Sequence, residues 1–144
     1  MDVAELAGRV IVLESRTLSA LQPCDWQVLY ERIWRPENFL EWASGLSGAD
    51  MAQEGPLWKA TGPNGIVRIR FTDHNDFGIM DHWVELADGK TVYVPLRVIA
   101  NGNGSEVQLT LFRQPGMTSD KFEKDAEWVL RDLEALKSLA SGLR

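Results

Sequence analysis

The sequence contains little of what several large classes of protein require. Its single cysteine, Cys24, leaves no partner for an internal disulfide, and its N-terminus lacks the basic segment and apolar run of a signal peptide. We therefore expect a protein of the reducing cytoplasm. No apolar run approaches the roughly 20 residues of a transmembrane helix, so we expect no membrane span.

Basic residues are also few and scattered. The chain has 15 Lys and Arg against 21 Asp and Glu, which gives a net charge of −6. Binding to a phosphate backbone needs a clustered basic face, so we expect no nucleic-acid partner. The glycines lie in turn sequences, and no glycine-rich phosphate loop or Gly-x-Ser-x-Gly elbow is present. The sequence therefore predicts no nucleotide cofactor.

Candidate catalytic residues are few. Neither His74 nor His82 stands at zinc-ligand spacing from another ligand, so no metal site is expected, and Cys24 lacks an evident histidine partner. His74 is interpreted as a solvated turn residue in the segment 73–77. His82 directly follows Asp81, and strand neighbours point to opposite faces, so we expect His82 to face outward. No catalytic residue can be named.

What the sequence does contain is a well-marked C-terminal helix over residues 118–139. Apolar residues recur at steps of three and four, and charged residues fall on the opposite side. Such a helix is about 33 Å long, enough to cross a small sheet. The whole chain, residues 1–144, fits one domain. The apolar stripe comprises Phe122, Ala126, Val129, Leu133, Leu136 and Ala140.

The elements before this helix follow a mixed order. A β-branched run, residues 10–13 within the segment 9–18, predicts a first strand. Residues 23–34 have helical spacing, and a second short helix from Pro36 to Gly45 follows, because proline disfavours the helical conformation of its preceding residue. The period then changes to two, with turn residues between apolar segments. Six further strands are predicted over residues 48–54, 57–61, 66–72, 79–87, 90–100 and 105–113.

The turns predict which side chains share a face. A two-residue turn at Gly102-Asn103 places Val98 opposite Val107, Leu96 opposite Leu109 and Val94 opposite Leu111, all facing inward. A two-residue turn at Asp88-Gly89 in turn places Trp83 opposite Val94 and Asp81 opposite Leu96, with Glu85 on the same inner face. Around Pro63-Asn64, Trp58 lies beside Ile69, and Val67 and Phe71 point inward.

Two inward carboxylates among aromatic side chains predict a ligand cavity under the C-terminal helix, because pockets combine apolar walls with a few polar groups. Arg113 is a candidate counter-charge for Glu85. The alternatives are a structural ion pair near the sheet edge and a core filled by tryptophans. The predicted ligand-binding residues are Trp58, Phe71, Asp81, Trp83, Glu85, Val94, Leu96, Arg113, Phe122, Asp125 and Val129.

The outer face of the predicted sheet is also apolar. Met80, Val84, Tyr93, Ile99 and Phe112 would be exposed there in a monomer. A symmetric homodimer would cover them, and ordinary scattered surface apolarity is the alternative.

The chain resembles the START-like superfamily, which includes Bet v 1-type allergens and polyketide cyclase-like (SRPBCC) proteins. The residues that carry the resemblance lie in the helix pair, Trp26–Tyr30 with Pro36-Glu37-Asn38-Phe39 and Glu41-Trp42, and in three later segments, residues 77–82, 95–98 and 112–117. The resemblance implies an α+β helix-grip fold: a seven-stranded curved antiparallel sheet wrapped around the C-terminal helix, with two short helices between strands one and two.

Three functions are consistent with this reading. The first is a carrier or sensor of a small apolar or aromatic molecule. The second is a polyketide cyclase- or dehydratase-like enzyme that uses an inward carboxylate such as Asp81 as its acid or base. The third is a module that binds a protein through the outer sheet face.

Overall fold

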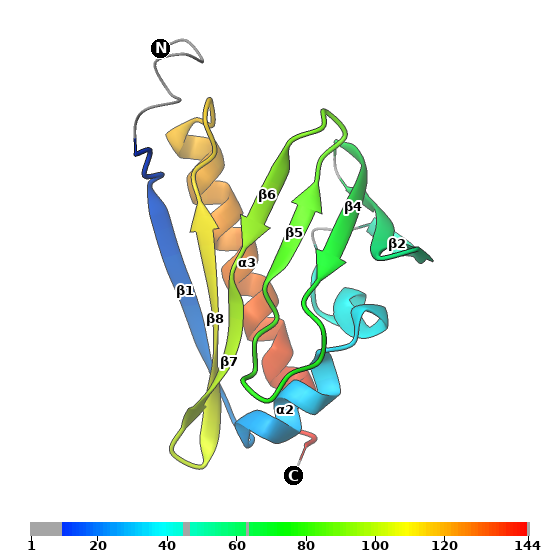
Figure 1. Ribbon diagram of the computed structural model, residues 1–144. Coiled ribbons are helices and arrows are strands. Elements are labelled where there is room, and N and C mark those ends of the chain that lie inside the picture. The colour runs from blue at the N-terminus through cyan, green and yellow to red at the C-terminus, as the bar shows by residue number, and fades with distance from the viewer. Residues whose placement is uncertain (1–9, 45–46, 63, 144) are drawn as a thin grey trace.

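A long C-terminal helix lies across two antiparallel sheets (Figure 1). The computed structural model describes residues 10–44, 47–62 and 64–143. One sheet has the order β1-β8-β7, with β1 Ser15–Gln22, β7 Leu96–Asn101 and β8 Gly104–Phe112. The other has the order β2-β3-β4-β5-β6, with β2 Ser47–Glu54, β3 Leu57–Gly62, β4 Gly65–Phe71, β5 His82–Glu85 and β6 Thr91–Val94. The helices are α2 Trp26–Ile33, the 3₁₀ helix η1 Pro36–Glu41 and α3 Ser119–Ala140.

The α+β class and the element order are confirmed, but eight described strands in two sheets replace the predicted seven-stranded sheet. The strand predicted over residues 90–100 is divided at Pro95, which lacks the N–H that a continuous ladder would use. Before Pro95 the chain pairs with β5, and after it the chain pairs with β8. The two sheets meet here, because Met80 N donates to Leu96 O at 2.8 Å and Val98 N donates to Gly78 O at 2.9 Å.

The first strand lies later than predicted. The run of residues 10–13 is not a strand, and Val10 and Val12 are 92% and 85% exposed. β1 instead pairs with β8 from Ser15↔Phe112 to Gln22↔Ser105, and β8 ends at Phe112. A strand needs a partner for its backbone, and β8 offers none to the earlier run.

The hairpin of β5 and β6 has a different register from the predicted one. Trp83 lies opposite Tyr93 and Glu85 opposite Thr91, because the loop spans Ala87, Asp88 and Gly89 instead of two residues. Gly89 has φ +88°, as the last residue of a three-residue hairpin loop requires. A shift of one residue exchanges the two faces of a strand, so His82 and Val84 face inward and Trp83 and Glu85 face outward.

Other predicted register pairs are confirmed, but Val94 lies opposite His82 of β5 and not in a ladder opposite Leu111. Val98 lies opposite Val107 and Leu96 opposite Leu109, joined through Gly102-Asn103. Trp58 lies opposite Ile69. Asp25 caps α2, accepting hydrogen bonds from Gln27 N and Val28 N. Gly45 and Pro63, which entered the sequence predictions, lie outside the described residues.

The apolar stripe of α3 packs against the sheets as predicted. Thr118 caps the helix by accepting a hydrogen bond from Lys121 N, and Leu133 and Leu136 are fully buried. β1 runs beside α3 from the Arg16–Glu123 ion pair to Gln22, whose Nε2 donates to Leu133 O at 3.1 Å. α2 closes the lower end of the fold (Figure 1). No helix in the described ranges combines the length and apolarity needed to cross a membrane.

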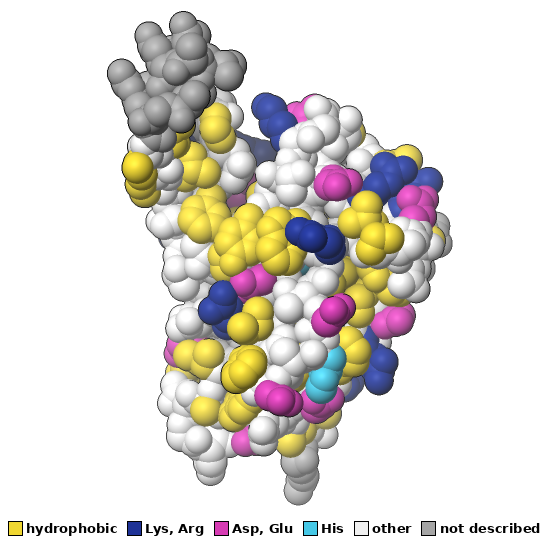
Figure 2. Space-filling model, viewed as in Figure 1, with side chains coloured by type: hydrophobic (Ala, Val, Ile, Leu, Met, Phe, Trp, Pro, Cys, Tyr) yellow, Lys and Arg dark blue, Asp and Glu magenta, His cyan; other side chains and the backbone are white. Residues whose placement is uncertain are grey.

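The outer face carries a row of stacked aromatic rings. Trp83 stacks on Tyr93 with centroids 5.3 Å apart, and Tyr93 stacks on Phe112 at 6.2 Å. Figure 2 shows hydrophobic side chains in a row across this face, next to basic side chains. Two residues expected on this face do not lie there: Met80 is 7% exposed, and Val84 lines the interior. The predicted homodimer through this face stays a prediction.

Candidate functional site

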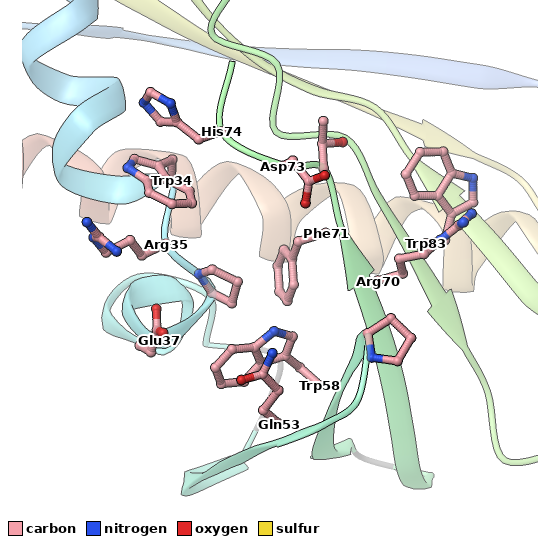
Figure 3. Close-up of a pocket in the computed structure, with 13 residues that line it drawn as sticks. Trp34, Arg35, Glu37, Gln53, Trp58, Arg70, Phe71, Asp73, His74 and Trp83 are labelled. Carbon is pink, nitrogen blue, oxygen red and sulfur yellow. The ribbon is translucent and has the colours of Figure 1, made fainter.

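The edge groove is a hollow of about 680 Å³ at the end of β4. Trp58 of β3 lies opposite Ile69 of β4, and β3 begins only one residue before Trp58, at Leu57. β4 continues to Phe71, so its end extends beyond β3. Residues from both faces of the sheet therefore reach the groove, together with the joint between α2 and η1 (Figure 3). It is lined by Trp34, Arg35, Pro36, Glu37, Gln53, Pro56, Trp58, Arg70, Phe71, Thr72, Asp73, His74 and Trp83.

Two arginines in the edge groove stack on tryptophans. The Arg35 guanidinium carbon lies 4.7 Å from the Trp34 ring centroid, and that of Arg70 lies 4.6 Å from the Trp83 ring centroid. A guanidinium over an indole face is held by cation–π attraction. The groove therefore has two positioned positive charges.

His74 is placed more specifically than a solvated turn residue. Its Nε2 lies 2.6 Å from Glu31 Oε1, and its ring contacts Tyr30 and Trp34 with centroids 5.4 and 4.8 Å apart. The neighbouring loop is held by Tyr30, whose hydroxyl accepts a hydrogen bond from Asn75 N at 2.9 Å. These contacts join α2 to the loop after β4, and they fix the position of His74 and Trp34 in the lining of the groove.

Three aromatic side chains separate the groove from the interior. Phe39 contacts Phe71 with ring centroids 5.2 Å apart and contacts His82 at 5.3 Å. Phe71 and His82 are 5.7 Å apart. Because Phe71 lines the groove and Phe39 and His82 line the space behind it, this trio divides two separate hollows.

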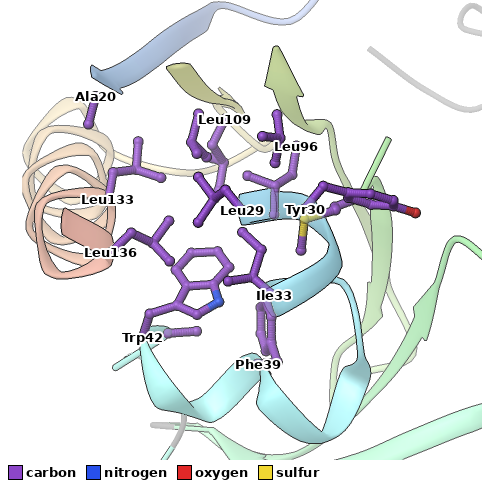
Figure 4. Packing of buried hydrophobic residues seen from close by; sticks show 14 of the residues in the cluster. Ala20, Leu29, Tyr30, Ile33, Phe39, Trp42, Leu96, Leu109, Leu133 and Leu136 are labelled. Carbon is purple, nitrogen blue, oxygen red and sulfur yellow. The ribbon is translucent and has the colours of Figure 1, made fainter. Parts of the chain in front are cut away.

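The inner cavity is a space of about 240 Å³ between the sheets and α3. Its walls come from η1 and the residues after it, from strands of both sheets and from α3. Figure 4 shows Trp42 beside Leu136 of α3, with Leu29 between Trp42 and Leu109 of β8. The cavity is lined by Phe39, Trp42, Ala43, Ile69, His82, Val84, Val94, Leu109, Leu111, Val129 and Asp132.

His82 is one of two ionisable groups in this cavity. It is 4% exposed, and burial lowers its pKa from 6.5 to about 4, so the imidazole is neutral at pH 7. Its Nδ1 lies 3.2 Å from Met80 O, and a carbonyl can only accept, so Nδ1 carries the proton. Nε2 is left as an acceptor, and no described residue donates to it. The expectation that His82 faces outward is wrong, because the hairpin register is shifted.

Asp132 of α3 is the second ionisable group. Its carboxylate accepts a hydrogen bond from the Ser44 hydroxyl, which in turn accepts one from Trp128 Nε1 at 2.8 Å. Burial raises the pKa of Asp132, although the Ser44 hydrogen bond acts in the opposite direction. The inner cavity thus has apolar walls and two polar groups, on β5 and on α3.

Asp81 is buried but does not line this cavity. Its carboxylate accepts hydrogen bonds from Arg97 Nε and Nη2 at 3.0 and 2.9 Å, from the Tyr93 hydroxyl at 2.7 Å and from Leu96 N at 2.9 Å. Burial acts to raise the pKa of Asp81, but these donors together outweigh it and lower the pKa. Asp81 therefore forms a structural ion pair with Arg97, at the junction of the two sheets and not at the predicted sheet edge.

Three further predicted positions are wrong. Glu85 is exposed opposite Arg68, and Trp83 faces outward against Tyr93, both because of the shifted hairpin. Arg113 does not reach Glu85; it pairs with Glu14 at 3.0 Å and donates to Met117 O at 2.9 Å.

The remaining predicted site residues do not lie together at one site. Val94 and Val129 line the inner cavity, and Trp58 and Phe71 line the edge groove. Leu96 and Phe122 are buried core residues, and Asp125 forms an ion pair with Lys121 one helical turn earlier. Cys24 is buried, which raises the pKa of its thiol.

Sequence reasoning missed His82, Val84 and Asp132 as cavity residues. Gly89 was the available signal for the first two, since glycine is common as the last residue of a three-residue loop. Reading the loop in this way would have placed both residues inward. Asp132 lies on the flank of the apolar stripe of α3, where sequence spacing alone does not decide between the boundary of the stripe and a cavity wall.

No protein-family model matches this chain, and no curated protein matches it. Solved structures do match. The protein XoxI from Bacillus cereus has a TM-score of 0.70 at 13% identity over 89% of this chain and 96% of its own. A START superfamily protein from Mycobacterium smegmatis has a TM-score of 0.64 at 10% identity, over 89% and 97%. Ara h 8.0201 has a TM-score of 0.64 at 11% identity, over 91% and 99%.

These likenesses cover nearly the whole of each chain, and identities this low bear on the fold alone. The element order, the long C-terminal helix and the curved antiparallel sheets agree with them. The resemblance inferred from the sequence is therefore confirmed: the chain has the START-like, Bet v 1-like fold.

Proposed function

We propose that this protein binds a small, mainly apolar molecule in the inner cavity between the sheets and α3. The observation that carries the proposal is the composition of that space: aromatic and aliphatic walls with two polar groups, His82 and Asp132. Ligand sites typically combine such walls with a few positioned polar groups. The START-like fold of the chain supports a hydrophobic ligand in general terms.

The volume indicates the size of the ligand. An engineered cavity of about 150 Å³ in another protein binds benzene. A space of about 240 Å³ therefore suits a molecule somewhat larger than benzene, such as a fused pair of aromatic rings.

The polar groups indicate its chemistry. Neutral His82 offers Nε2 as an acceptor, and the Asp132 carboxyl offers oxygen acceptors at the other wall. Both suit a ligand with a hydroxyl donor, and leaving such a donor unpaired in an apolar space is costly. We infer a phenol or a similar aromatic or alicyclic alcohol, bound by a carrier or a sensor.

The enzyme alternative based on Asp81 is not favoured. Its carboxylate is engaged by Arg97, Tyr93 and a backbone N–H, and its pKa is lowered, so it is neither free nor poised to exchange a proton at neutral pH.

Titration with 2-naphthol, followed by calorimetry, tests the proposal. We expect saturable binding below millimolar concentration, and Val129→Trp should abolish it by filling the cavity. Leu130→Trp is the matched control, because Leu130 is the next residue on α3 and is 41% exposed. Val94→Phe fills the same space from β6 if the helix variant folds poorly. Unchanged binding in both filled variants, or no binding to the wild type, would contradict the proposal.

A further inference from the structure

The edge groove shares no lining residue with the inner cavity, and the Phe39–Phe71 contact stands between them. We propose that the groove is a second, independent binding site, for a planar organic anion: a flat apolar ring system with one carboxylate or sulfonate group.

The charge of the ligand follows from Arg35 and Arg70. Most other arginines of the described chain have carboxylate partners: Arg16, Arg32, Arg68, Arg97 and Arg113. Among described residues, no carboxylate pairs with Arg35 or Arg70. Each guanidinium is instead held over an indole face, which leaves the N–H donors at its edge unused. Positioned, unpaired guanidinium groups suit a planar carboxylate or a similar anion.

The flat ring follows from the surfaces between the two arginines. Figure 3 shows Phe71 and Trp58 between Arg35 on one side and Arg70 with Trp83 on the other. No guanidinium stacks on Trp58 in the described structure, so its ring is available to an aromatic ligand, which gains stacking in addition to apolar contact. A ligand of this kind could rest on Trp58 or Phe71 while its acid group reaches a guanidinium.

A cationic ligand fits less well. Tryptophans grouped around a groove can form a cage for an ammonium group. Here Arg35 and Arg70 already cover one face of Trp34 and of Trp83, and they would repel another cation. The aromatic side chains of the groove therefore favour an anion that pairs with the stacked guanidiniums.

The ligand should carry one acidic group, not many. Glu37 and Asp73 also line the groove, and neither is in an ion pair in the described structure. Two carboxylates beside two guanidiniums leave no excess positive charge for a polyanion. This balance argues against nucleic acid as the occupant. A single acid group that pairs with one guanidinium is compatible with it.

Three bicyclic probes of similar shape test the proposal by calorimetry: 2-naphthoate, 2-naphthol and 2-naphthylmethylammonium. We expect 2-naphthoate to bind, with an affinity that falls as salt is raised, and the ammonium compound not to bind. We expect 2-naphthoate binding to persist in the Val129→Trp protein, whose inner cavity is filled. This background separates the groove from the cavity, so either site can fail without the other.

Arginine variants locate the anion. The variant that removes the guanidinium bound by the acid group, either Arg35→Gln or Arg70→Gln, should weaken 2-naphthoate binding about tenfold, because it removes a charge-assisted hydrogen bond. The other variant should weaken binding less, because it changes only the charge at the far side of the groove. Arg131→Gln is the matched control: Arg131 also has no carboxylate partner in the described structure and stacks on a tryptophan, Trp128, but it lies outside the groove. Its variant should bind 2-naphthoate as the wild type does.

The results that overturn the proposal are equally definite. Absence of saturable 2-naphthoate binding at millimolar concentration would refute it. So would loss of binding in Val129→Trp alone, which would place the anion in the inner cavity. Equal effects of Arg35→Gln, Arg70→Gln and Arg131→Gln would show a nonspecific charge effect.

Discussion

Arg97 of β7 holds the buried carboxylate of Asp81 with two hydrogen bonds, at the junction where the two sheets meet. The Asp81 side chain is 8% exposed, whereas that of Arg97 is 45% exposed. The same carboxylate binds Leu96 N directly after Pro95, so the pair also holds the chain where it passes from one sheet to the other.

Asp81→Asn should lower the free energy of unfolding by about 2–3 kcal/mol. The amide cannot satisfy the donors of Arg97, Tyr93 and Leu96 as the carboxylate does, and the partial exposure of Arg97 limits the loss. Urea denaturation measures the change. Arg68→Gln, which breaks the half-exposed pair with Glu54, is the control and should cost less than about 1 kcal/mol. Equal losses in the two variants would contradict a special role for Asp81.

Stability should also depend on Asp81 at acid pH. The pKa of Asp81 is lower in the folded protein than its ordinary value of 3.8, so the carboxylate stabilises the fold above pH 3.8 and this contribution is lost as pH falls through the lower folded pKa. The difference in unfolding free energy between wild type and Asp81→Asn should shrink below pH 3.8. A difference that stays constant down to the lowest pH measured would argue against the ion pair.

His82 gives a second pH dependence, in a higher window. Its pKa falls from 6.5 when unfolded to about 4 when folded, so the unfolded chain binds the proton first. Stability should therefore decrease as pH falls from 6.5 to about 4, by about 3 kcal/mol from this residue. His82→Gln should remove this component, while His74→Gln should retain it. Denaturation curves across this range measure the effect.

Trp42 should report ligand binding in the inner cavity, and Trp83 should not. Trp42 lines that cavity, whereas Trp83 faces outward and stacks on Tyr93. An apolar ligand should change the tryptophan fluorescence of the wild type and of Trp83→Phe. The same change should be largely lost in Trp42→Phe, with binding itself checked by calorimetry. A response that depended on Trp83 would place the ligand elsewhere.

Gly78 should tolerate no side chain. It has φ +70°, and a Cβ at this position would lie 2.2 Å from Val98 O, in the backbone where the two sheets meet. Gly78→Ala should destabilise the protein by more than about 3 kcal/mol, because backbone atoms must move. Gly89→Ala has a similar φ but open space, so it should cost about 1 kcal/mol. Thermal unfolding of the two variants compares them directly.

Local patterns in the sequence determined much of the fold. Helix α3 was predictable because its apolar residues repeat with helical spacing, and α2 because Asp25 caps it and Pro36 limits it. The β7–β8 register was predictable because Gly102-Asn103 forms a two-residue turn. These features depend on residues close together in the chain, so short-range physical rules were sufficient.

Only the tertiary structure decided the composition of the inner cavity. One additional residue in the loop before Lys90 moved His82 inward and Trp83 outward. The Asp88-Gly89 pair fits a two-residue loop as well as a three-residue loop that ends at Gly89, so the tertiary structure decided between them. The ion-pair partner of Asp81 could not be predicted from the sequence either, because Arg97 reaches Asp81 only after the chain passes at Pro95 into the second sheet. Arg35 and Arg70 meet at one groove because β4 extends beyond β3 beside the α2–η1 joint. These contacts join residues that are far apart in the sequence, so they depend on tertiary packing and not on a local sequence pattern.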